Sequence, residues 1–318
     1  MPNQNKKRLV RLALAATASA FGYACHALSQ DRSVRSKLRE DAYRLKSGLD
    51  YGEEEENSSQ YISKRYDQYR RTSDLLSCPH ADGVTSEHYS AGKVHWLDYT
   101  ALEETEEVLV YFHGGKRLDH MTYSEWRMLE KLQAKLGWPI MVVAIESFFT
   151  RSYALEVELV YQLICQVKAK HQGYNWHALA YDSGAALTLE LVEANAKMFK
   201  QVLLLSPWLG EEVKQIEHLD EDYLLNRSQE EAVESAWQDQ DPLPKMTEMT
   251  ITHLPPVHFF VGAYDSWKQP ALKLYKRLRA HNKTTRFYLF ERMVHDFALQ
   301  AMPEADETLD LLVSELKQ

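Results

Sequence analysis

From about residue 84 to the end of the chain, short apolar runs alternate with longer stretches of helical periodicity. Continuous apolar runs of five or six residues are typical of strands buried on both faces of a parallel sheet. The pattern therefore predicts an α/β fold with a mostly parallel central sheet and helices on both faces. The expected strands are 84–89, 94–98, 108–112, 140–145, 177–181, 201–205, 257–261 and 286–290, and the expected helices are 122–136, 153–170, 184–198, 268–281 and 304–316.

Two polar segments do not follow this alternation. Residues 31–83 have helical patterns at 33–45 and 61–76, joined by the acidic run Glu53–Glu56, which is typical of a solvated linker. Residues 209–250 are acidic and polar and contain no strand pattern, so they predict a lid inserted into the domain. We therefore expect residues 31–83 to form a helical linker or cap and residues 84–318 to form the α/β domain.

The N-terminus allows two interpretations. Basic residues up to Arg11 precede an uncharged, alanine-rich stretch at 12–24, as in a signal peptide or a membrane anchor within residues 1–30. The stretch is shorter than the roughly 20 residues that span a bilayer, so it also fits a helix packed on the domain. The sequence leaves membrane association open, and with it the choice between an anchored or exported protein and a cytoplasmic one.

Composition excludes several classes of protein. The chain has 318 residues, 37 Lys and Arg against 46 Asp and Glu, and a net charge of −9, which gives no support for nucleic-acid binding. The three cysteines lack metal-ligand spacing, and no phosphate loop or dinucleotide glycine signature is present. These absences argue against a cysteine-bound metal and against a nucleotide-binding sheet.

In open α/β sheets the functional site lies at the carboxyl ends of the strands. Ser183 follows the strand at 177–181 and precedes a helix, which is the setting of a nucleophile on a strand-to-helix turn. The usual spacing places small residues two positions before and after the serine, whereas this chain has Tyr181 and Ala185 there. A bulky Tyr181 is expected to crowd the turn.

Three further strand ends carry residues that suit acyl transfer. His113-Gly114-Gly115 follows the first buried strand, where glycines let backbone amides donate to an oxyanion. Asp265 and His295 follow the last two strands, which gives the chain order nucleophile, acid, base. Each signal alone also fits a turn or a cap. The rival carboxylates Asp182 and Asp296 are interpreted as structural and as supporting His295 at most, and the helical Cys165 is rejected as a nucleophile.

With these motifs, residues 90–318 resemble the α/β-hydrolase fold, specifically the hormone-sensitive-lipase-like esterases and lipases. The resemblance is carried by His113-Gly-Gly, Tyr181-Asp-Ser-Gly-Ala, Gly262-Ala-Tyr-Asp265 and His295-Asp-Phe297. Lys116 departs from the pattern, because a third glycine often follows the His-Gly-Gly motif of this family.

The resemblance implies a serine hydrolase that cleaves a small-molecule carboxylic ester through an acyl-enzyme and needs neither a metal nor an organic cofactor. Ser183 would be the nucleophile, His295 the base and Asp265 its orienting partner, with Gly114, Gly115 and Gly184 as the oxyanion hole. Aromatic residues of the expected cap would suit short or medium acyl chains or aryl esters. The oligomeric state stays open.

Two other classes of function are consistent with the sequence. The first is a catalytically degenerate hydrolase-fold protein that binds or scaffolds, which the substitutions at Tyr181 and Lys116 motivate. The second is a membrane-tethered interaction protein whose function lies in its first 80 residues.

Overall fold

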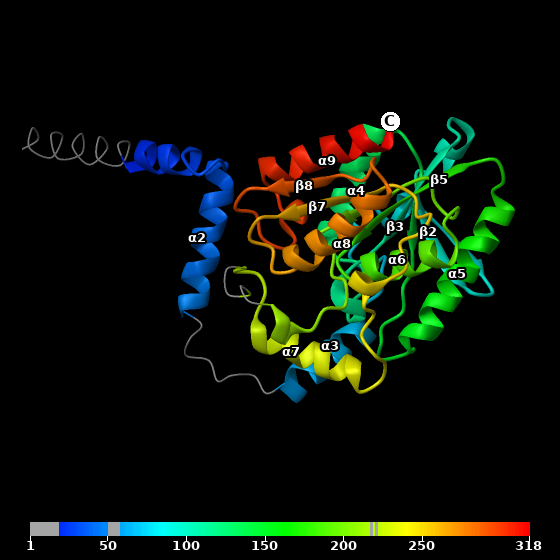
Figure 1. The fold of residues 1–318 in the computed structure, drawn as a ribbon, viewed down its shortest axis with the longest axis horizontal. Helices are drawn as coiled ribbons and strands as arrows, with labels where there is room; N and C mark the ends of the chain where they lie inside the picture. Colours follow the sequence, from blue (N-terminus) through cyan, green and yellow to red (C-terminus); the bar gives the residue numbers. More distant parts are fainter. Residues whose placement is uncertain (1–18, 50–57, 217–218, 220–221) are drawn as a thin grey trace, which may run out of the picture.

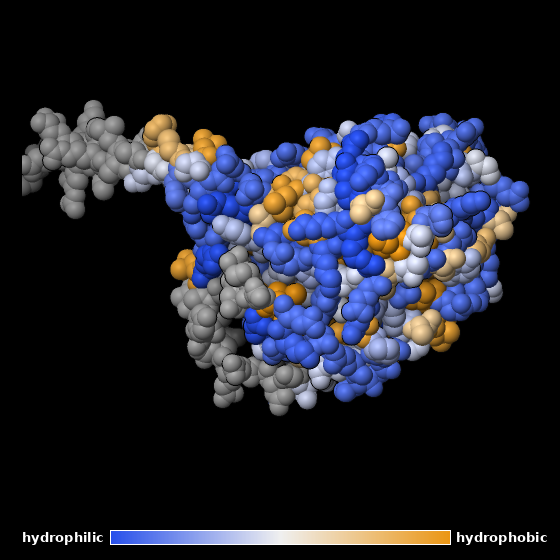
Figure 2. Space-filling view, viewed as in Figure 1, coloured by the Kyte–Doolittle hydropathy of each residue, from blue (hydrophilic) through white to orange (hydrophobic). Residues whose placement is uncertain are grey.

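A computed structural model describes residues 19–49, 58–216, 219 and 222–318. Residues 1–18, which include most of the expected signal or anchor segment, and the acidic run at 53–56 lie outside the described residues. Among the described residues, no helix combines the length and apolar character needed to cross a membrane. Apolar side chains, including the exposed Phe21 and Leu28, lie along the helical residues 19–28 that project from the body (Figure 2).

An eight-stranded sheet forms the centre of the molecule (Figure 1). Its strand order is β1-β2-β4-β3-β5-β6-β7-β8; the β1–β2 and β2–β4 pairs at one edge are antiparallel, and the remaining pairs are parallel. The strands are β1 (Val84–Tyr89), β2 (Gly92–Leu97), β3 (Glu107–Phe112), β4 (Ile140–Val143), β5 (Asn175–Tyr181), β6 (Val202–Leu205), β7 (Val257–Gly262) and β8 (Phe287–Phe290). This confirms the expected fold class and every expected strand.

Helices cover both faces of the sheet. Successive strand residues point to opposite sides, so a run of apolar residues places apolar side chains on both faces. In β3, Val108 and Val110 belong to one core and Leu109 and Tyr111 to the other. Helices α4 (Tyr123–Leu136) and α9 (Pro303–Leu316) cover the second face, and α5 (Tyr153–Lys170), α6 (Gly184–Ala194) and α8 (Lys268–His281) cover the first. The two cores make the sheet a rigid platform for the loops at its carboxyl end.

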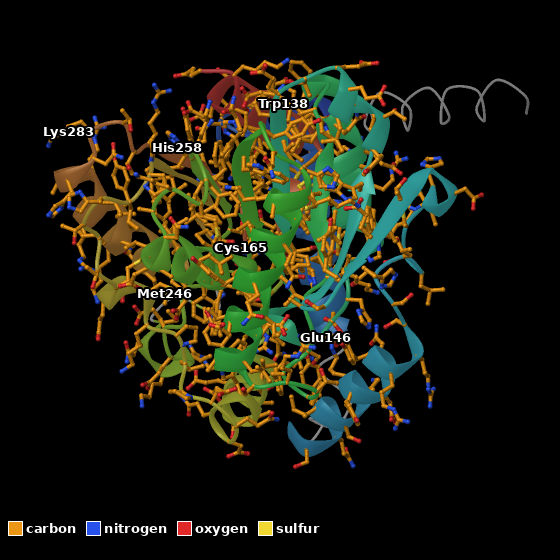
Figure 3. The ribbon with its side chains drawn as sticks, turned by 90° about the vertical axis from the view of Figure 1, so that its right-hand side faces the viewer. Trp138, Glu146, Cys165, Met246, His258 and Lys283 are labelled. Atoms are coloured by element: carbon orange, nitrogen blue, oxygen red, sulfur yellow. The ribbon has the colours of Figure 1, made fainter. Side chains whose placement is uncertain are left out.

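Local signals fix the ends of these helices close to their expected positions. Thr122 caps α4 in a capping box with Glu125, and Gly137 ends the helix in the left-handed conformation. Helix α6 ends at Ala194, four residues before the expected end, because Asn195 adopts an extended conformation. Figure 3 shows Cys165 on α5, where its thiol is exposed and far in sequence from the other two cysteines, which are also free.

The N-terminal helices and the insertion lie together at one end of the sheet (Figure 1). Helix α3 (Ser58–Arg71) packs against α7 (Arg227–Gln238) of the insertion, and α2 (Val34–Leu49) approaches α9. Polar contacts fasten them to the domain: Tyr69 donates to Glu146 at 2.8 Å, and the backbone amide of Ser33 donates to Glu304 at 2.6 Å. These elements cover the carboxyl end of the sheet.

Candidate active site

His295 and Asp265 meet at the carboxyl ends of β7 and β8. His295 Nδ1 lies 3.2 Å from Asp265 Oδ1 and 3.3 Å from Oδ2, and both side chains are buried. The backbone amide of His295 donates to Asp222 Oδ2 at 2.8 Å, which anchors the loop that carries the imidazole. The pair therefore has the arrangement of a base and the carboxylate that orients it.

The turn between β5 and α6 has its strained residue at Asp182 rather than at Ser183. Asp182 has φ of 46°, in the left-handed region, whereas Ser183 has an ordinary helical φ of −68°. A Cβ on Gly184 would lie 2.4 Å from the carbonyl oxygen of Phe112, so the helix must start on a glycine there. The apex of this elbow is Asp182, flanked by Ala180 and Gly184 at the two-residue spacing of small positions.

The carboxylate of Asp182 lies among backbone amides. The N–H of Gly115 donates to Asp182 Oδ2 at 2.9 Å and the N–H of Lys116 donates to the same oxygen at 3.0 Å. Asp182 Oδ1 is buried and has no hydrogen-bond partner among the described residues. One oxygen is thus held as an oxyanion would be, while the other accepts no hydrogen bond from the described part of the chain and lies 3.6 Å from His295 Nε2.

The far nitrogen of the imidazole faces two carboxylates. His295 Nε2 lies 3.6 Å from Asp182 Oδ1 and 3.0 Å from Asp296 Oδ1, and the hydroxyl of Tyr181 donates to Asp296. Sequence reasoning interpreted Asp182 as structural; the structure also places its Oδ1 at 3.6 Å from His295 Nε2. Asp296 was expected to support His295 at most, and it does touch that residue.

Of the six residues that the sequence proposed for the site, the structure brings Asp265 into contact with His295, and the amide of Gly115 donates to the neighbouring Asp182. Ser183 is buried, and its Oγ has no hydrogen-bond partner among the described residues, so the structure does not bring it to His295. The Gly114 amide points to Glu125 Oε1 at 3.4 Å, and Gly184 serves the close approach of α6 to β3.

Tyr181 does not crowd the turn as expected. Its ring lies over Gly114, where a Cβ would come within 2.6 Å of the ring, so the glycine of the β3 loop makes room for the tyrosine. The site residues that sequence reasoning missed are Asp182, Asp222 and the amide of Lys116. The spacing Ala180-x-Asp182-x-Gly184 was the signal for the first.

Charges around His295 set the protonation of the site. Burial lowers the pKa of His295, but the charges of Asp296 and Asp265, the contact with Asp182 and the hydrogen bond to Asp265 raise it well above its usual value. For Asp182, burial raises the pKa, yet the contact with His295, its charge and the charge of Lys116 leave it lowered. Both directions favour an imidazolium beside an ionised Asp182.

A pocket of about 810 Å³ opens onto these groups between the sheet and the helices that cover it. Asp182, His295 and Asp296 lie at its base, and residues of α2, α3 and α7 form its walls. Lys116 forms an ion pair with Glu230 of α7 and lies over the Trp267 ring, with Nζ 5.5 Å from the ring centroid. This side chain therefore ties the loop after β3 to the insertion.

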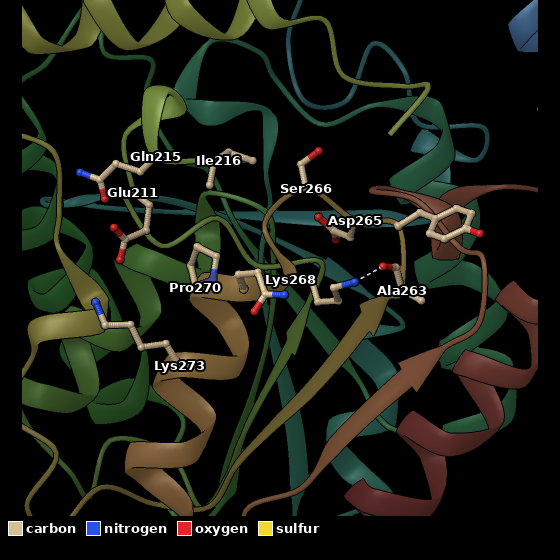
Figure 4. A pocket seen from close by; sticks show the side chains of 11 residues that line it. Glu211, Gln215, Ile216, Ala263, Asp265, Ser266, Lys268, Pro270 and Lys273 are labelled. Carbon is tan, nitrogen blue, oxygen red and sulfur yellow. Dashed lines mark hydrogen bonds between the residues drawn. The ribbon is translucent and has the colours of Figure 1, made fainter. Parts of the chain in front are cut away.

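A second cavity, of about 460 Å³, is lined by Asp265 and its neighbours in the loop after β7, together with residues of α8 (Figure 4). Lys268 and Lys273 of α8 line it together with Glu211, and Lys268 donates to the carbonyl oxygen of Ala263. His295 is not among its lining residues. Within the described ranges, no cluster of three or more His, Cys, Asp or Glu residues could hold a metal ion.

Comparisons with known proteins agree with this architecture. A family model described as alpha/beta hydrolase fold matches residues 109–299. Similar solved structures include a hyperthermophilic esterase from Pyrobaculum calidifontis (14% identity, 87% of this chain and 96% of that chain, TM-score 0.69) and an esterase from the bacterial hormone-sensitive lipase family (16%, 83% and 98%, 0.65). Carboxyl esterase 2 from Tuber melanosporum is also similar (16%, 74% and 86%, 0.61). No curated protein matches this sequence.

Proposed function

Because this chain belongs to the α/β-hydrolase fold family, whose hormone-sensitive-lipase-like esterases its motifs resemble, we propose that it hydrolyses ester bonds in the pocket of about 810 Å³. His295 transfers the proton, and Asp265 holds the imidazole in one tautomer. The observation that carries this proposal is the contact of 3.2 Å between Asp265 and Nδ1 of His295, the residue of this pair that lines the pocket.

The nucleophile that the sequence proposes for a carboxylic ester is Ser183, acting through an acyl-enzyme. Its hydroxyl would have to reach His295 Nε2, which faces Asp182 and Asp296. Short to medium acyl chains are the proposed substrates, because a pocket of about 810 Å³ is large enough for such ligands.

A catalytically degenerate protein that binds small molecules is the second candidate. It is favoured by the amides of Gly115 and Lys116, which already hold the carboxylate of Asp182 where an ester carbonyl would need to bind. In such a protein the imidazolium of His295 would serve as a fixed charge.

Turnover of p-nitrophenyl esters across acyl chains of increasing length tests the proposal. We expect activity in the wild type, a loss of at least about 1,000-fold in Ser183→Ala if Ser183 is the nucleophile, and no loss in the control Ser314→Ala on the exposed face of α9. A fluorophosphonate probe should label the wild type only if Ser183 is activated. Equal background hydrolysis in wild type and His295→Gln would contradict ester hydrolysis and favour the binding role.

A further inference from the structure

The elbow presents a carboxylate where a hydrolase of this fold presents its nucleophile. Asp182 is the residue with positive φ, its Oδ2 accepts two backbone amides, and its Oδ1 faces His295 Nε2 at 3.6 Å. From this geometry we infer that Asp182 is itself a nucleophile and that the site opens epoxides through a covalent alkyl ester on Asp182.

Asp182 Oδ1 meets the requirements of a nucleophile. Asp182 Oδ1 is buried, lacks a hydrogen-bond partner among the described residues and belongs to a side chain that lines the pocket. A carboxylate oxygen without donors keeps its lone pairs available, and burial away from water strengthens its interaction with a polarised carbon. Lowering of the Asp182 pKa by His295 and Lys116 keeps the group ionised.

The chemistry of a carboxylate selects the electrophile. Attack on the acyl carbon of an alkyl ester would have to expel an alkoxide far more basic than a carboxylate, so the reaction would run backwards. Attack on a saturated carbon gives a stable ester instead, provided that ring strain or a good leaving group drives the step. An epoxide supplies the ring strain. All of its atoms stay in the adduct, because ring opening releases no leaving group.

The protons balance in the first step. Asp182 Oδ1 forms a bond to an epoxide carbon, the carbon–oxygen bond of the ring breaks, and its electron pair stays on the oxygen. That alkoxide takes the proton from the His295 imidazolium, whose Nε2 faces Asp182. The products are a hydroxyalkyl ester of Asp182 and a neutral imidazole. The rise of the His295 pKa by Asp265 and Asp296, against the effect of burial, supplies this acid at neutral pH.

The second step uses the groups already proposed for ester hydrolysis. Neutral His295, oriented by Asp265, takes a proton from water, and the hydroxide adds to the carboxyl carbon of the Asp182 ester. The oxyanion forms at the oxygen that the amides of Gly115 and Lys116 already hold. Collapse breaks the bond between the carboxyl carbon and the ester oxygen; the expelled alkoxide takes the proton of the new carboxylic acid and leaves as a diol, so the carboxylate and the imidazolium are restored. The inference rests on the proposed function only in this hydrolytic use of His295 and Asp265.

Styrene oxide is the probe that tests this inference, and the wild-type protein gives the first measurement. In a single turnover in H₂¹⁸O, the water oxygen should enter the peptide that contains Asp182, whose mass rises by 2 Da, while the diol carries unlabelled oxygen. Label found only in the diol would overturn the inference. Because no variant is required, the result does not depend on the folding of a mutant.

Variants give the second measurement. Wild type quenched with acid during turnover should carry an adduct with the full mass of styrene oxide on Asp182, and His295→Gln should form this adduct more slowly, because the imidazolium that protonates the alkoxide is lost. The adduct should be lost at least about 1,000-fold in Asp182→Asn and retained in the control Asp310→Asn, whose side chain is 67% exposed on α9. An adduct that persists in Asp182→Asn, or that requires Ser183, would overturn the inference.

The two proposals fail separately. Ester turnover that depends on Ser183, with no ¹⁸O label on Asp182, supports the proposed function and contradicts the inference. Label on Asp182 without p-nitrophenyl ester turnover does the reverse. Neither ester turnover nor label would overturn both.

Discussion

The site has two halves whose geometry has different causes. The base half is the pair Asp265 and His295, and the elbow half is Asp182 at the turn between β5 and α6. Asp265 and His295 each follow a strand, and their contact requires only that β7 and β8 be neighbours in a parallel sheet. The elbow depends on which residue of β5–α6 takes the positive φ, and that choice is made by β3, whose carbonyls exclude a Cβ at Gly184. A site residue whose position depends only on strand order can be predicted from the sequence. The residue at the apex of the turn depends on a contact with another strand, so a prediction from the sequence is easily wrong by one residue.

Breaking the base half should have the largest effect. Asp265→Asn keeps the shape of the side chain but removes the charge that fixes the His295 tautomer, so turnover of any substrate should fall by about 10⁴-fold. Steady-state kinetics should show the loss in kcat rather than in KM. Thermal unfolding of the variant, compared with wild type, controls for damage to the fold. A loss below about tenfold would mean that His295 is not the base.

Strand and helix positions were predictable because apolar runs and caps are local signals. The capping box at Thr122 and the buried run of β7 are each visible within a few residues of sequence. The position of Asp182 at the apex of the turn was not predicted, because the Asp-Ser-Gly pattern indicates the serine instead. Only the close approach of α6 to β3 determines which of the two adjacent residues stands at the apex. The contact of Asp222 with the His295 amide joins residues 73 positions apart, and no local pattern indicates it.

Gly184→Ala tests the contact that fixes the elbow register. The added Cβ would lie 2.4 Å from the Phe112 oxygen and 2.6 Å from the His113 oxygen, both of them backbone atoms that cannot rotate away. We expect a loss of about 1–3 kcal/mol in the free energy of unfolding, measured by urea denaturation. Gly83→Ala, where no atom lies within 4 Å of the added Cβ, is the matched control and should change stability little. Equal stability of the two variants would contradict the role of Gly184.

Asp222→Asn tests how the buried charges of the base half depend on pH. Burial, and then the charge of Asp265, raises the pKa of Asp222 to about 7. A carboxyl group with a raised folded-state pKa contributes stability that is present below its unfolded pKa of about 3.9 and lost as pH rises through about 7. The asparagine does not titrate, so the decline in stability between pH 4 and pH 7 should be shallower, by at most about 1.4 kcal/mol per pH unit.

Urea denaturation of wild type and Asp222→Asn at several pH values between 4 and 8 gives this difference directly. A hydrogen bond weakened by the amide lowers stability equally at every pH and leaves the slope unaffected. Parallel curves for the two proteins would contradict the raised pKa.

Tyr181→Phe should have the smallest effect, and it tests whether the two halves communicate through Asp296. The hydroxyl donates to Asp296, which lies 3.0 Å from His295 Nε2, while the ring packs over Gly114. Phenylalanine keeps the packing and removes one donor, so stability should fall by about 0.5–1.5 kcal/mol. Burial raises the pKa of Asp296 and the Tyr181 hydrogen bond lowers it, so its loss should raise that pKa further and leave Asp296 less often ionised beside His295. The His295 pKa should then fall, which is measurable as a lower-pH midpoint of the imidazole titration by NMR. An unchanged midpoint would mean that Asp296 does not influence His295, and that the elbow acts on the base through Asp182 alone.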